Sequence, residues 1–414
     1  MQIIELIEAT GAKVLAEVDK DLDVKISTDT RTIQKGDFYL PLKGASFDGE
    51  KFINQAFEKG AIGAFCTGDN GTLQVKDTLT AYLQLANYRR KKLNFTVVAI
   101  TGSSGKTTTK ELAASVLSEK FRTFKTPLNH NNEIGFCQTI FEAPDDTEIL
   151  VLEMGMRGLG EIELLSKYAE PDITIISNVG TAHIGRLGSR ENIAKAKCEI
   201  VKYQRGNIFI AHDDELIKKT VQFSGKKIFY SIKDVKILEK DTHYSKFEYY
   251  GNIYELNVGG DYNIENALSA INTGLALRMK VNEIQSGLKK YAPIEKRWEA
   301  VNAGGFEIIN DSYNANPESM RAFIDTIFEL YEKPVVILGD MGELGEDEIK
   351  YHSELGKYIN SHKNLRQDAE ILSIGKLSKY ITDGVTNCPA KHFETIEQAV
   401  DYIKNKDTKV QLFL

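Results

Sequence analysis

Cysteine is scarce in this sequence, which has four cysteines, one tryptophan and eight prolines among 414 residues. The cysteines are Cys66, Cys137, Cys198 and Cys388, and no two of them form a Cys-X-X-Cys pair. A disulfide framework needs closely spaced cysteines and an oxidising compartment. The sequence therefore argues against a small disulfide-stabilised secreted domain and favours a reducing cytoplasm.

An excess of positive charge is also missing, since the formal net charge is -7 and the isoelectric point lies near 5.7. A nucleic-acid-binding protein needs basic residues to neutralise phosphates, so this balance argues against that class. It leaves open the binding of a single nucleotide, which needs only a local site. No apolar run approaches the roughly 20 residues of a membrane span. The acidic segment 1–8 lacks the pattern of a signal peptide.

The residues that are present suit a packed globular protein, with 42% apolar and 27% charged residues. At about 150 residues per domain, the length predicts two or three domains. Apolar, β-branched runs at 95–100, 149–152, 173–176 and 208–210 alternate with helical patterns. This alternation predicts an α/β fold with a largely parallel central sheet. A more β-rich stretch at 226–254 is expected to form an antiparallel edge or insertion.

Shorter elements precede this central region. The segment 61–65 is expected to be a strand, and a helix is expected around 82–92. That helix ends in the basic cluster Arg89–Lys92, which we interpret as a solvated helix end favoured by the helix dipole.

A second α/β set follows a boundary near 291–297. Its expected strands are 306–309, 335–338 and 370–374. Asp311 and Asp340 come just after two of these strands, at the carboxyl ends where open parallel sheets bind ligands. The placement of these two residues is consistent with a ligand-binding site.

A glycine loop lies between a strand and a helix near residue 100. The strand ends at Ile100 and runs into Thr101-Gly-Ser-Ser-Gly-Lys-Thr-Thr108. Backbone N–H groups and the helix N-terminus of such a loop hold phosphates. Lys106 supplies a cation for the outer phosphates, and Thr107 supplies a hydroxyl for Mg²⁺. Two residues separate the glycines instead of the usual four, so this is a shortened P-loop; a Gly-Ser turn with a surface lysine is the alternative.

Three residues beyond the loop are further candidates. Glu153 ends a buried strand, where P-loop proteins hold their metal, and is the leading Mg²⁺ ligand. His183 follows the next strand, and a structural role and a metal or phosphate role are equally compatible with that position. Nothing in the periodicity distinguishes Lys197 from an ordinary surface lysine.

These features resemble the Mur ligase family, and within it the branch that adds D-alanyl-D-alanine to UDP-N-acetylmuramoyl-tripeptide. The resemblance covers nearly the whole chain. Besides the shortened P-loop, its segments are Asp29–Arg31, Gly36–Phe38, Leu42–Gly44, Phe47–Gly49, Asn129–Asn132 with Gly135, Glu153–Gly155, Asn178–His183, Ala196–Ile200, Asn310–Pro317 and Gly339–Gly345. The run Tyr313-Asn-Ala-Asn-Pro317 is the specific one, because it separates this branch from the ligases that add earlier amino acids and from folylpolyglutamate synthetase.

The resemblance implies three domains. A small α/β domain at 1–93 would bind the UDP end of the substrate. A central P-loop domain at 94–292, with a mostly parallel sheet, would be the ATPase. A Rossmann-like domain at 293–414 would close over the site.

The resemblance also implies roles for single residues. The phosphates of ATP would be held by Gly102, Ser103, Ser104, Gly105, Lys106, Thr107 and Thr108, and the rest of the nucleotide by Asn263, Asn266, Arg297 and Asp311. The metal ligands would be Thr107, Glu153, His183 and Lys197, with Lys197 carbamylated, and catalysis would rest on Lys106, Glu153, His183 and Lys197. The substrates would meet Thr30, Arg31, Lys43 and Gly44 at the UDP end, Asn131 and Asn132 along the muramoyl-peptide, and Tyr313, Asn314 and Asn316 near the γ-phosphate and the dipeptide.

The activity implied is ATP-dependent amide bond formation in peptidoglycan synthesis, by a cytoplasmic enzyme that acts as a monomer with Mg²⁺. A terminal carboxylate attacks the γ-phosphate of ATP and becomes an acyl phosphate, which the dipeptide amine then attacks. Positioning and cations supply most of the catalysis for such transfers. No nucleophilic side chain is needed, and domain closure keeps the acyl phosphate from water.

Two departures from the family pattern stand out. Tyr262 occupies the place of a histidine that usually precedes the first adenine-site asparagine. Family members usually continue into a Lys-Gly-Ser-Arg-like segment beyond the strand expected at 409–414, and the substrate contacts of that segment are not expected here.

Two other hypotheses compete with this one. Another amide ligase of the superfamily is disfavoured by the Tyr313–Pro317 run and by the complete first domain. A nucleotide-driven switch is disfavoured because it needs no acceptor-activating set such as Glu153, His183 and Lys197. The third residue of the acceptor peptide, lysine or diaminopimelate, leaves no trace in these residues.

Overall fold

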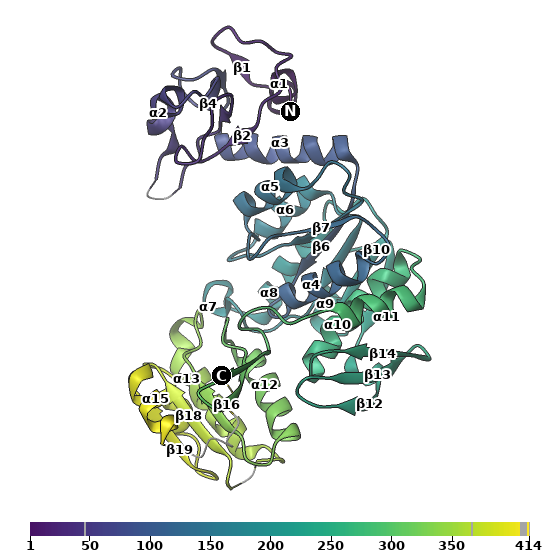
Figure 1. Cartoon of the computed structure of the whole chain (residues 1–414), viewed down its shortest axis with the longest axis vertical. Helices are drawn as coiled ribbons and strands as arrows, with labels where there is room; N and C mark the ends of the chain where they lie inside the picture. Colours follow the sequence, from purple (N-terminus) through teal and green to yellow (C-terminus); the bar gives the residue numbers. More distant parts are fainter. Residues whose placement is uncertain (45–46, 366, 406–411, 414) are drawn as a thin grey trace. The chain divides into compact units, whose positions relative to one another are not determined.

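The computed structural model describes residues 1–44, 47–365, 367–405 and 412–413 (Figure 1). The chain forms two compact units. The first consists of residues 1–95 and 130–147, and the second of residues 96–129 and 148–414. The domain boundaries expected at 93 and 292 remain predictions.

The first unit is built on a five-stranded sheet with the order β1-β5-β4-β3-β2. The pairing of β1 with β5 is antiparallel, and the other pairs are parallel. The strands are β1 (Lys13–Val14), β2 (Ile26–Ser27), β3 (Phe38–Tyr39), β4 (Gly63–Cys66) and β5 (Leu73–Gln74). The helices are α1 (Ile3–Thr10), η1 (Gly49–Phe52), α2 (Ile53–Glu58), α3 (Thr78–Leu93) and α5 (Glu133–Glu142).

The basic cluster at the end of α3 is a solvated helix end only at Lys91 and Lys92, which are exposed, and the prediction was wrong for Arg89 and Arg90. The Arg89 guanidinium donates to the carbonyls of Ile140 and Ala143, at 3.2 and 2.9 Å. Arg90 is only 1% exposed, and Lys92 pairs with Glu5. The cluster ties α3 to α5 and α1, because arginine can satisfy carbonyls that end a neighbouring helix.

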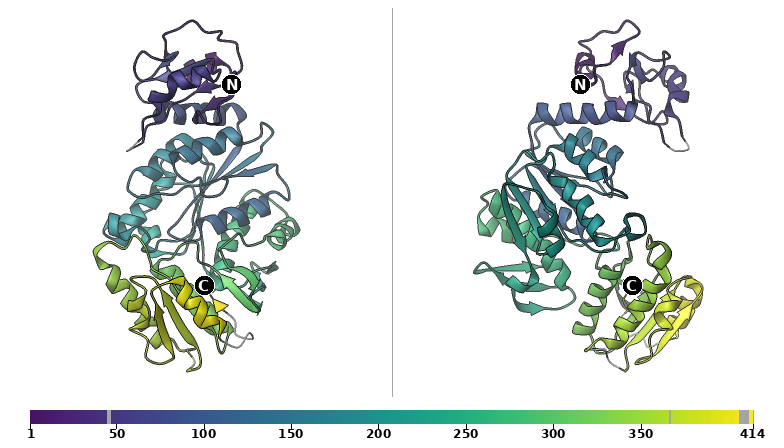
Figure 2. Two further views of the ribbon diagram at one scale, coloured as in Figure 1. Left: turned by 60° about the vertical axis from the view of Figure 1, so that its left-hand side comes forward. Right: turned by 180° about the vertical axis from the view of Figure 1, so that it is seen from behind.

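A six-stranded parallel sheet forms the centre of the second unit, with the order β11-β10-β9-β6-β8-β7. Figure 2 shows helices on both of its faces. The strands are β6 (Thr96–Thr101), β7 (Thr123–Lys125), β8 (Ile149–Glu153), β9 (Ile173–Ile176), β10 (Ile208–His212) and β11 (Lys226–Tyr230). The helices are α4 (Lys106–Leu117), α6 (Glu161–Ala169), α7 (Ile184–Leu187), α8 (Arg190–Cys198), α9 (Glu215–Thr220), α10 (Asp261–Ala276) and α11 (Val281–Lys290).

The strand order reverses around β6. The chain leaves β6 for the edge strand β7 and returns through β8, and it then crosses to β9 on the other side of β6. Ligands bind at such a switch point, outside the carboxyl ends of the strands. The loops after β6, β8 and β9 therefore meet at one place.

The β-rich stretch divides in two. β11 joins the parallel sheet, while a separate antiparallel meander consists of β12 (Lys236–Lys240), β13 (Ser245–Tyr249) and β14 (Asn252–Leu256). The expected antiparallel insertion is thus confirmed for 236–256 and wrong for 226–230.

A second six-stranded sheet follows, with the order β15-β16-β20-β17-β18-β19. Its strands are β15 (Glu299–Ala303), β16 (Phe306–Asn310), β17 (Val335–Leu338), β18 (Glu370–Ile374), β19 (Ala390–Phe393) and β20 (Leu412–Phe413). Its helices are α12 (Pro317–Leu330), α13 (Glu348–Ser361), α14 (Lys379–Thr382) and α15 (Ile396–Lys404). β15 and β16 form a hairpin, and the other pairs are parallel. Of the strand expected at 409–414, residues 409–411 and 414 lie outside the described residues.

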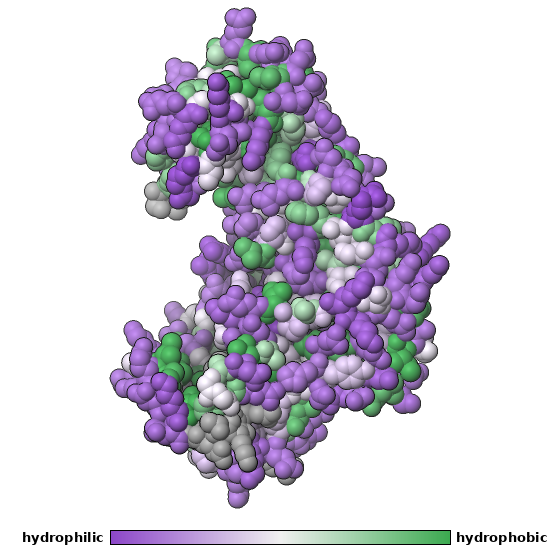
Figure 3. Space-filling view, in the orientation of Figure 1, coloured by the Kyte–Doolittle hydropathy of each residue, from purple (hydrophilic) through white to green (hydrophobic). Residues whose placement is uncertain are grey.

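One core cluster of the second unit includes residues of both of its six-stranded sheets, and a smaller separate cluster packs between the second sheet and α15. Residues of α4, α10 and α11 pack with those of β6 and β8, and the same cluster extends to α12 and β17. On the face of the molecule that Figure 3 displays, hydrophobic side chains form small groups among hydrophilic ones. Among the described residues, no helix is long and apolar enough to cross a membrane.

Candidate active site

The shortened P-loop turns tightly between β6 and α4. Gly105 has a φ of 75°, a left-handed conformation that glycine adopts without strain. A Cβ on Gly105 would lie 2.5 Å from Asn266 Oδ1, and a Cβ on Gly102 would lie 1.8 Å from Ser177 Oγ. An alanine at either position would therefore have to displace the side chain of Asn266 or Ser177.

Asn178, just after β9, holds the backbone of the loop. Its Oδ1 accepts hydrogen bonds from the N–H groups of Ser103 and Ser104, at 3.1 and 3.0 Å. Its Nδ2 donates to Ser104 Oγ at 2.8 Å. The next N–H groups, at the start of α4, have no acceptor within the helix and are available to a phosphate.

Lys106 lies inside the loop. Its ammonium donates to the Gly102 carbonyl at 2.9 Å and approaches the Ser103 carbonyl at 3.5 Å. Burial lowers the pKa of Lys106, and the nearby Glu153 carboxylate acts in the opposite direction. The lysine is thus placed for an anion at the loop.

Glu153 ends β8 and is 4% exposed. Its Oε2 lies 3.8 Å from Lys110 Nζ, and Lys110 is fully buried. The Lys110 ammonium also donates to the carbonyls of Thr126 and Leu128, at 2.9 and 3.0 Å. Lys110 therefore supplies a buried positive charge beside the carboxylate, a contact that the sequence did not suggest because the lysine is two residues beyond the P-loop pattern.

His183 begins α7 in a left-handed conformation, with a φ of 66°. Its Nδ1 pairs with Glu343, from the segment after β17. Burial lowers the pKa of His183; the Glu343 carboxylate raises it, and the charges of Lys106 and Lys197 lower it further. The imidazole therefore lies within electrostatic reach of both lysines.

Lys197, on α8, is 1% exposed, so it is not an ordinary surface lysine. Burial holds the pKa of its amine well below the usual value, and the charge of Lys106 lowers it further. A neutral amine is the nucleophile that carbamylation requires.

The start of α10 lies against both the P-loop helix and the second sheet. Asn266 Oδ1 accepts a hydrogen bond from Thr109 Oγ1 at 3.2 Å, and Asn263 Nδ2 donates to the Gly259 carbonyl at 2.7 Å. Tyr262 Oη donates to Asp311 Oδ2 at 3.0 Å. The structure therefore brings Asn266 to the P-loop and Tyr262 to Asp311.

Asp311 and Arg297 are neighbours. Burial raises the pKa of Asp311 to about 6, although hydrogen bonds from Tyr262 and the Trp298 N–H and the charge of Arg297 lower it. The Arg297 guanidinium stacks over the Tyr313 ring at 4.1 Å.

The run 313–317 leads into α12. Asn316 caps this helix, since its Oδ1 accepts the Ser319 N–H at 2.9 Å, and it is buried. Tyr313 and Asn314 are exposed. The next acidic residue, Glu318, accepts hydrogen bonds from the N–H and the hydroxyl of Thr181. Glu318 was not among the residues that the sequence singled out, because an acid in the first turn of a helix is common.

The remaining candidates lie in the first unit. Thr30 donates its hydroxyl to Gln55 Oε1 at 3.1 Å and is buried. Arg31 is exposed and forms a bidentate pair with Asp29, whose pKa this pair lowers to about 2. Lys43, next to Gly44, is exposed and lies 3.8 Å from Asp48.

Two asparagines expected along the muramoyl-peptide also belong to the first unit. Asn132 caps α5, because its Oδ1 accepts the Gly135 N–H at 2.9 Å. Asn131 precedes it directly. These substrate roles remain predictions.

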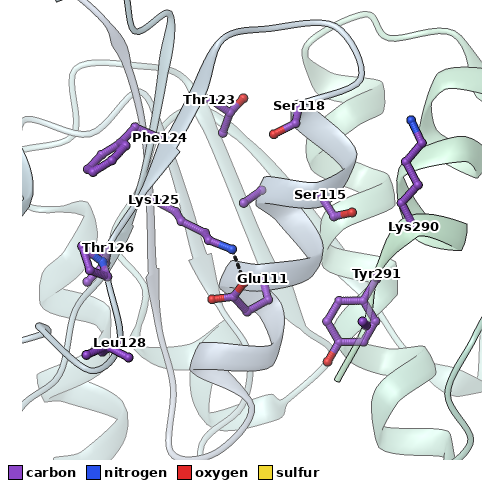
Figure 4. Close-up of a pocket in the computed structure, with 13 residues that line it drawn as sticks. Glu111, Ser115, Ser118, Thr123, Phe124, Lys125, Thr126, Leu128, Lys290 and Tyr291 are labelled. Carbon is purple, nitrogen blue, oxygen red and sulfur yellow. Dashed lines mark hydrogen bonds and ion pairs between the residues drawn. The ribbon is translucent and has the colours of Figure 1, made fainter. Parts of the chain in front are cut away.

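A cavity of about 560 Å³ lies along α4, between β7 and the end of α11 (Figure 4). The ion pair of Glu111 and Lys125 spans it, and Tyr291 lies at its edge. The Glu111 carboxylate also lies 3.2 Å from the Lys110 ammonium. This cavity therefore adjoins the buried lysine that forms an ion pair with Glu153.

The residues expected to hold a magnesium ion offer two kinds of donor, oxygen from Thr107 and Glu153 and nitrogen from His183. Among the described residues, no three His, Cys, Asp or Glu side chains form a group that could hold a metal. Hard oxygen ligands suit Mg²⁺, which also keeps several waters, so Glu153 and Thr107 are compatible with the ion. A carbamate on the buried Lys197 would add a further oxygen donor.

The sheet order and the glycine loop define a P-loop α/β protein with a second, mostly parallel six-stranded sheet. Residues 100–274 match the Mur ligase middle domain, and residues 296–411 match the Mur ligase glutamate ligase domain. The chain belongs to the Mur ligase family.

Named relatives agree with this assignment. The chain is 36% identical to the UDP-N-acetylmuramoyl-tripeptide--D-alanyl-D-alanine ligase of Bacillus subtilis (strain 168), over 92% of this chain and 85% of that protein. The structure of MurF from Acinetobacter baumannii has a TM-score of 0.89 and 28% identity, over 100% of this chain and 94% of that one. MurF from Thermotoga maritima, in complex with ADP, has a TM-score of 0.82 and 28% identity, over 94% of this chain and 93% of that one.

Proposed function

We propose that this protein joins D-alanyl-D-alanine to UDP-N-acetylmuramoyl-tripeptide, with ATP, in peptidoglycan precursor synthesis. The observation that carries the proposal is the 36% identity to a ligase of that name over 92% of this chain. The P-loop and its buried charged neighbours agree with the ATP-dependent step. We expect the enzyme to act as a monomer in the cytoplasm.

The residues of the P-loop would bind and orient ATP. The start of α4 and the Lys106 ammonium face the phosphates, while Asn263, Asn266, Arg297 and Asp311 would hold the rest of the nucleotide. Charge on the transferred phosphoryl group spreads over its outer oxygens, so a fixed cation lowers the barrier. Lys106 is already held in place by the loop carbonyls.

Mg²⁺, with Thr107, Glu153, His183 and the carbamate of Lys197 as proposed ligands, would neutralise charge between the nucleotide and the acceptor. This chain contributes the positions of those ligands. Lys110 places a positive charge 3.8 Å from Glu153, and Glu343 pairs with Nδ1 of the His183 ring, which would leave Nε2 for the ion.

The two chemical steps need no side-chain nucleophile. The terminal carboxylate of the tripeptide attacks the γ-phosphorus and ADP leaves. The amine of D-alanyl-D-alanine then attacks the carbonyl of the acyl phosphate, inorganic phosphate leaves, and the amine loses a proton. Tyr313, Asn314 and Asn316 are the proposed neighbours of these groups, and Thr30, Arg31, Lys43, Gly44, Asn131 and Asn132 are the proposed contacts for the rest of the acceptor.

Phosphate release from ATP tests the proposal. We expect rapid release only when UDP-N-acetylmuramoyl-tripeptide and D-alanyl-D-alanine are both present. Release that ignores both substrates would indicate a nucleotide-driven switch. Release that depends on another acceptor or another amine would indicate a different amide ligase of the superfamily.

A further inference from the structure

A tyrosine on α10 makes a hydrogen bond to the acidic residue of the nucleotide site. Tyr262 Oη lies 3.0 Å from Asp311 Oδ2, and the other oxygen of Asp311 accepts the Trp298 N–H at 3.1 Å. Both carboxylate oxygens therefore have fixed donors from two different segments of the second unit.

The ring of Tyr262 is held as firmly as its hydroxyl. It packs edge-to-face on Trp298, with centroids 5.6 Å apart and planes at 81°. Trp298 packs in turn on Phe323, and its indole N–H donates to the Thr242 carbonyl at 2.8 Å. Such edge-to-face pairs stabilise one arrangement of the rings.

The backbone at Trp298 has an unusual conformation. Its φ is 53°, and Lys296, two residues earlier, has a φ of 60°. Residues other than glycine adopt this region rarely, and the surrounding contacts must hold them there. The segment that carries Arg297 is therefore held by the contacts of Trp298, including the ring of Tyr262.

Arg297 has a donor available. Its guanidinium stacks over Tyr313, and Nε is buried with no hydrogen bond to any described residue. The charge of Arg297 lowers the pKa of Asp311, so the two groups are close. An acceptor on a bound nucleotide can satisfy that Nε, since a buried donor without a partner is costly.

Helix α10, which carries Tyr262, contacts the P-loop one turn later through Asn266. Asn266 Oδ1 accepts from Thr109 and lies against Gly105. A shift of Tyr262 would therefore change the distance between the phosphate end and the Asp311 end of the nucleotide site.

We propose that Tyr262 is a positioning residue for the nucleotide: its hydroxyl holds the Asp311 carboxylate, and its ring holds the Arg297–Trp298 segment, in the geometry that binds ATP. This inference rests on the proposed function only in taking Asp311 and Arg297 as nucleotide contacts.

Calorimetric titration of the full-length protein with ADP tests the inference without any ligase assay. We expect Tyr262→Phe to weaken ADP binding about tenfold, the effect of losing one hydrogen bond to a charged group. We expect Tyr262→His to restore part of the affinity, because it keeps a ring donor. Tyr254→Phe is the matched control, because it removes a buried hydroxyl that has no hydrogen bond to a described residue.

The pH dependence of ADP affinity distinguishes a positioning role of Tyr262 from a general contribution to the stability of the fold. The charged and titratable groups that face Asp311 are Tyr262 on α10, Arg297 before β15, and Tyr291 after α11. Loss of the Tyr262 donor raises the pKa of Asp311. The acid limb of the ADP affinity should therefore move to higher pH in Tyr262→Phe and stay in place in Tyr254→Phe.

Wild-type ADP affinity and an unmoved acid limb in Tyr262→Phe would overturn the inference. If that variant does not fold, Tyr262→His decides, and an affinity and acid limb equal to those of the wild type would overturn it. An ADP-binding wild type that makes no amide product would contradict the proposed function alone.

Discussion

Glu318 Oε2 accepts two hydrogen bonds from Thr181, from the backbone N–H at 3.0 Å and from the hydroxyl at 2.7 Å. Thr181 follows β9 in the central sheet, and Glu318 is in the first turn of α12 beside the second sheet. A Cβ on Gly180 would lie 2.9 Å from the same carboxylate. The loop that leads to His183 is therefore fixed to α12 through one side chain.

We predict that Glu318→Ala lowers ligase turnover about tenfold, because a hydrogen bond to a charged group contributes about 1.5–3 kcal/mol. Thr181→Val removes only the hydroxyl and should cost less. The double variant should be no slower than Glu318→Ala, since both changes break one interaction. Steady-state turnover of the three variants measures this, and losses that multiply would show that the two residues act separately.

The glycines of two helix starts allow a matched comparison. Gly105 and Gly160 each precede a helix, and their φ angles are positive, at 75° and 87°. An alanine in this conformation costs about 1–2 kcal/mol of backbone strain at either position. At Gly160 nothing lies within 4 Å of an added Cβ, whereas at Gly105 Asn266 Oδ1 lies 2.5 Å away.

Gly105→Ala should therefore abolish measurable ATP binding, while Gly160→Ala should bind ATP as the wild type does and show only a lower melting temperature. Nucleotide titration and thermal unfolding of both variants measure this. Equal ATP affinity in the two variants would mean that the approach of Asn266 does not constrain the loop.

Much of this fold could be predicted from the sequence because buried parallel strands are continuous apolar runs. The expected strands at 149–152, 173–176 and 335–338 differ from the observed ones by one residue or none. The edge strand β7 escaped prediction because its three residues are all partly exposed. Short polar edge strands give no apolar run.

The site was less predictable, for a physical reason. P-loop chemistry is local in sequence, so Lys106 and Thr107 could be predicted from the residues alone. The partners of such residues are not local: Lys110 reaches Glu153, Glu343 reaches His183, and Tyr262 reaches Asp311 only in the folded chain. Burial of Lys197 was equally hidden, since one lysine on a polar helix has no signature.

We predict that the carbamylated form of Lys197 is essential for ligase turnover. Lys197→Ala should lower turnover at least about 100-fold, because even indirect metal partners contribute 10–100-fold. A small carboxylate such as acetate should restore part of the activity, since it replaces the lost anionic oxygens. Lys195→Ala, an exposed lysine on the same helix, should stay fully active.

A nuclear magnetic resonance signal from ¹³C-labelled bicarbonate should show the carbamate in the wild type and in Lys195→Ala, and not in Lys197→Ala. Burial lowers the pKa of the Lys197 amine and so favours its neutral form, which is the form that reacts with carbon dioxide. A folded Lys197→Ala that no carboxylate rescues, together with a missing carbamate signal in the wild type, would contradict the modification.

Asp311 should make the nucleotide-free protein less stable at neutral pH. Its pKa is about 6 in the folded state against an ordinary value of 3.8, so the folded state binds more protons than the unfolded state between these values. The free energy of unfolding changes with pH in proportion to the number of protons bound by the unfolded state minus the number bound by the folded state. Here that difference is negative, so the free energy of unfolding falls as the pH rises from about 4 to about 6.

Asp311→Asn should therefore stabilise the nucleotide-free protein at pH 7.5 by at most about 3 kcal/mol, by the linkage of 1.36 kcal/mol to each pKa unit. The gain should vanish below about pH 4, and ATP affinity should fall. Asp340→Asn is the control with opposite sign: three backbone N–H groups lower the pKa of Asp340, so its loss should destabilise at neutral pH. Urea unfolding across pH measures both, and a less stable Asp311→Asn at pH 7.5 would refute the account of Asp311.

The central claim is that the acceptor carboxylate is activated by phosphoryl transfer from ATP. Mass spectrometry of inorganic phosphate, after turnover with UDP-N-acetylmuramoyl-tripeptide labelled with ¹⁸O in its terminal carboxylate, tests this claim most directly. One carboxylate oxygen bonds to phosphorus in the acyl phosphate and leaves with it when the D-alanyl-D-alanine amine attacks. We predict one ¹⁸O atom in the phosphate released for each amide bond formed at a fully labelled carboxylate. Amide product accompanied by unlabelled phosphate would contradict the mechanism.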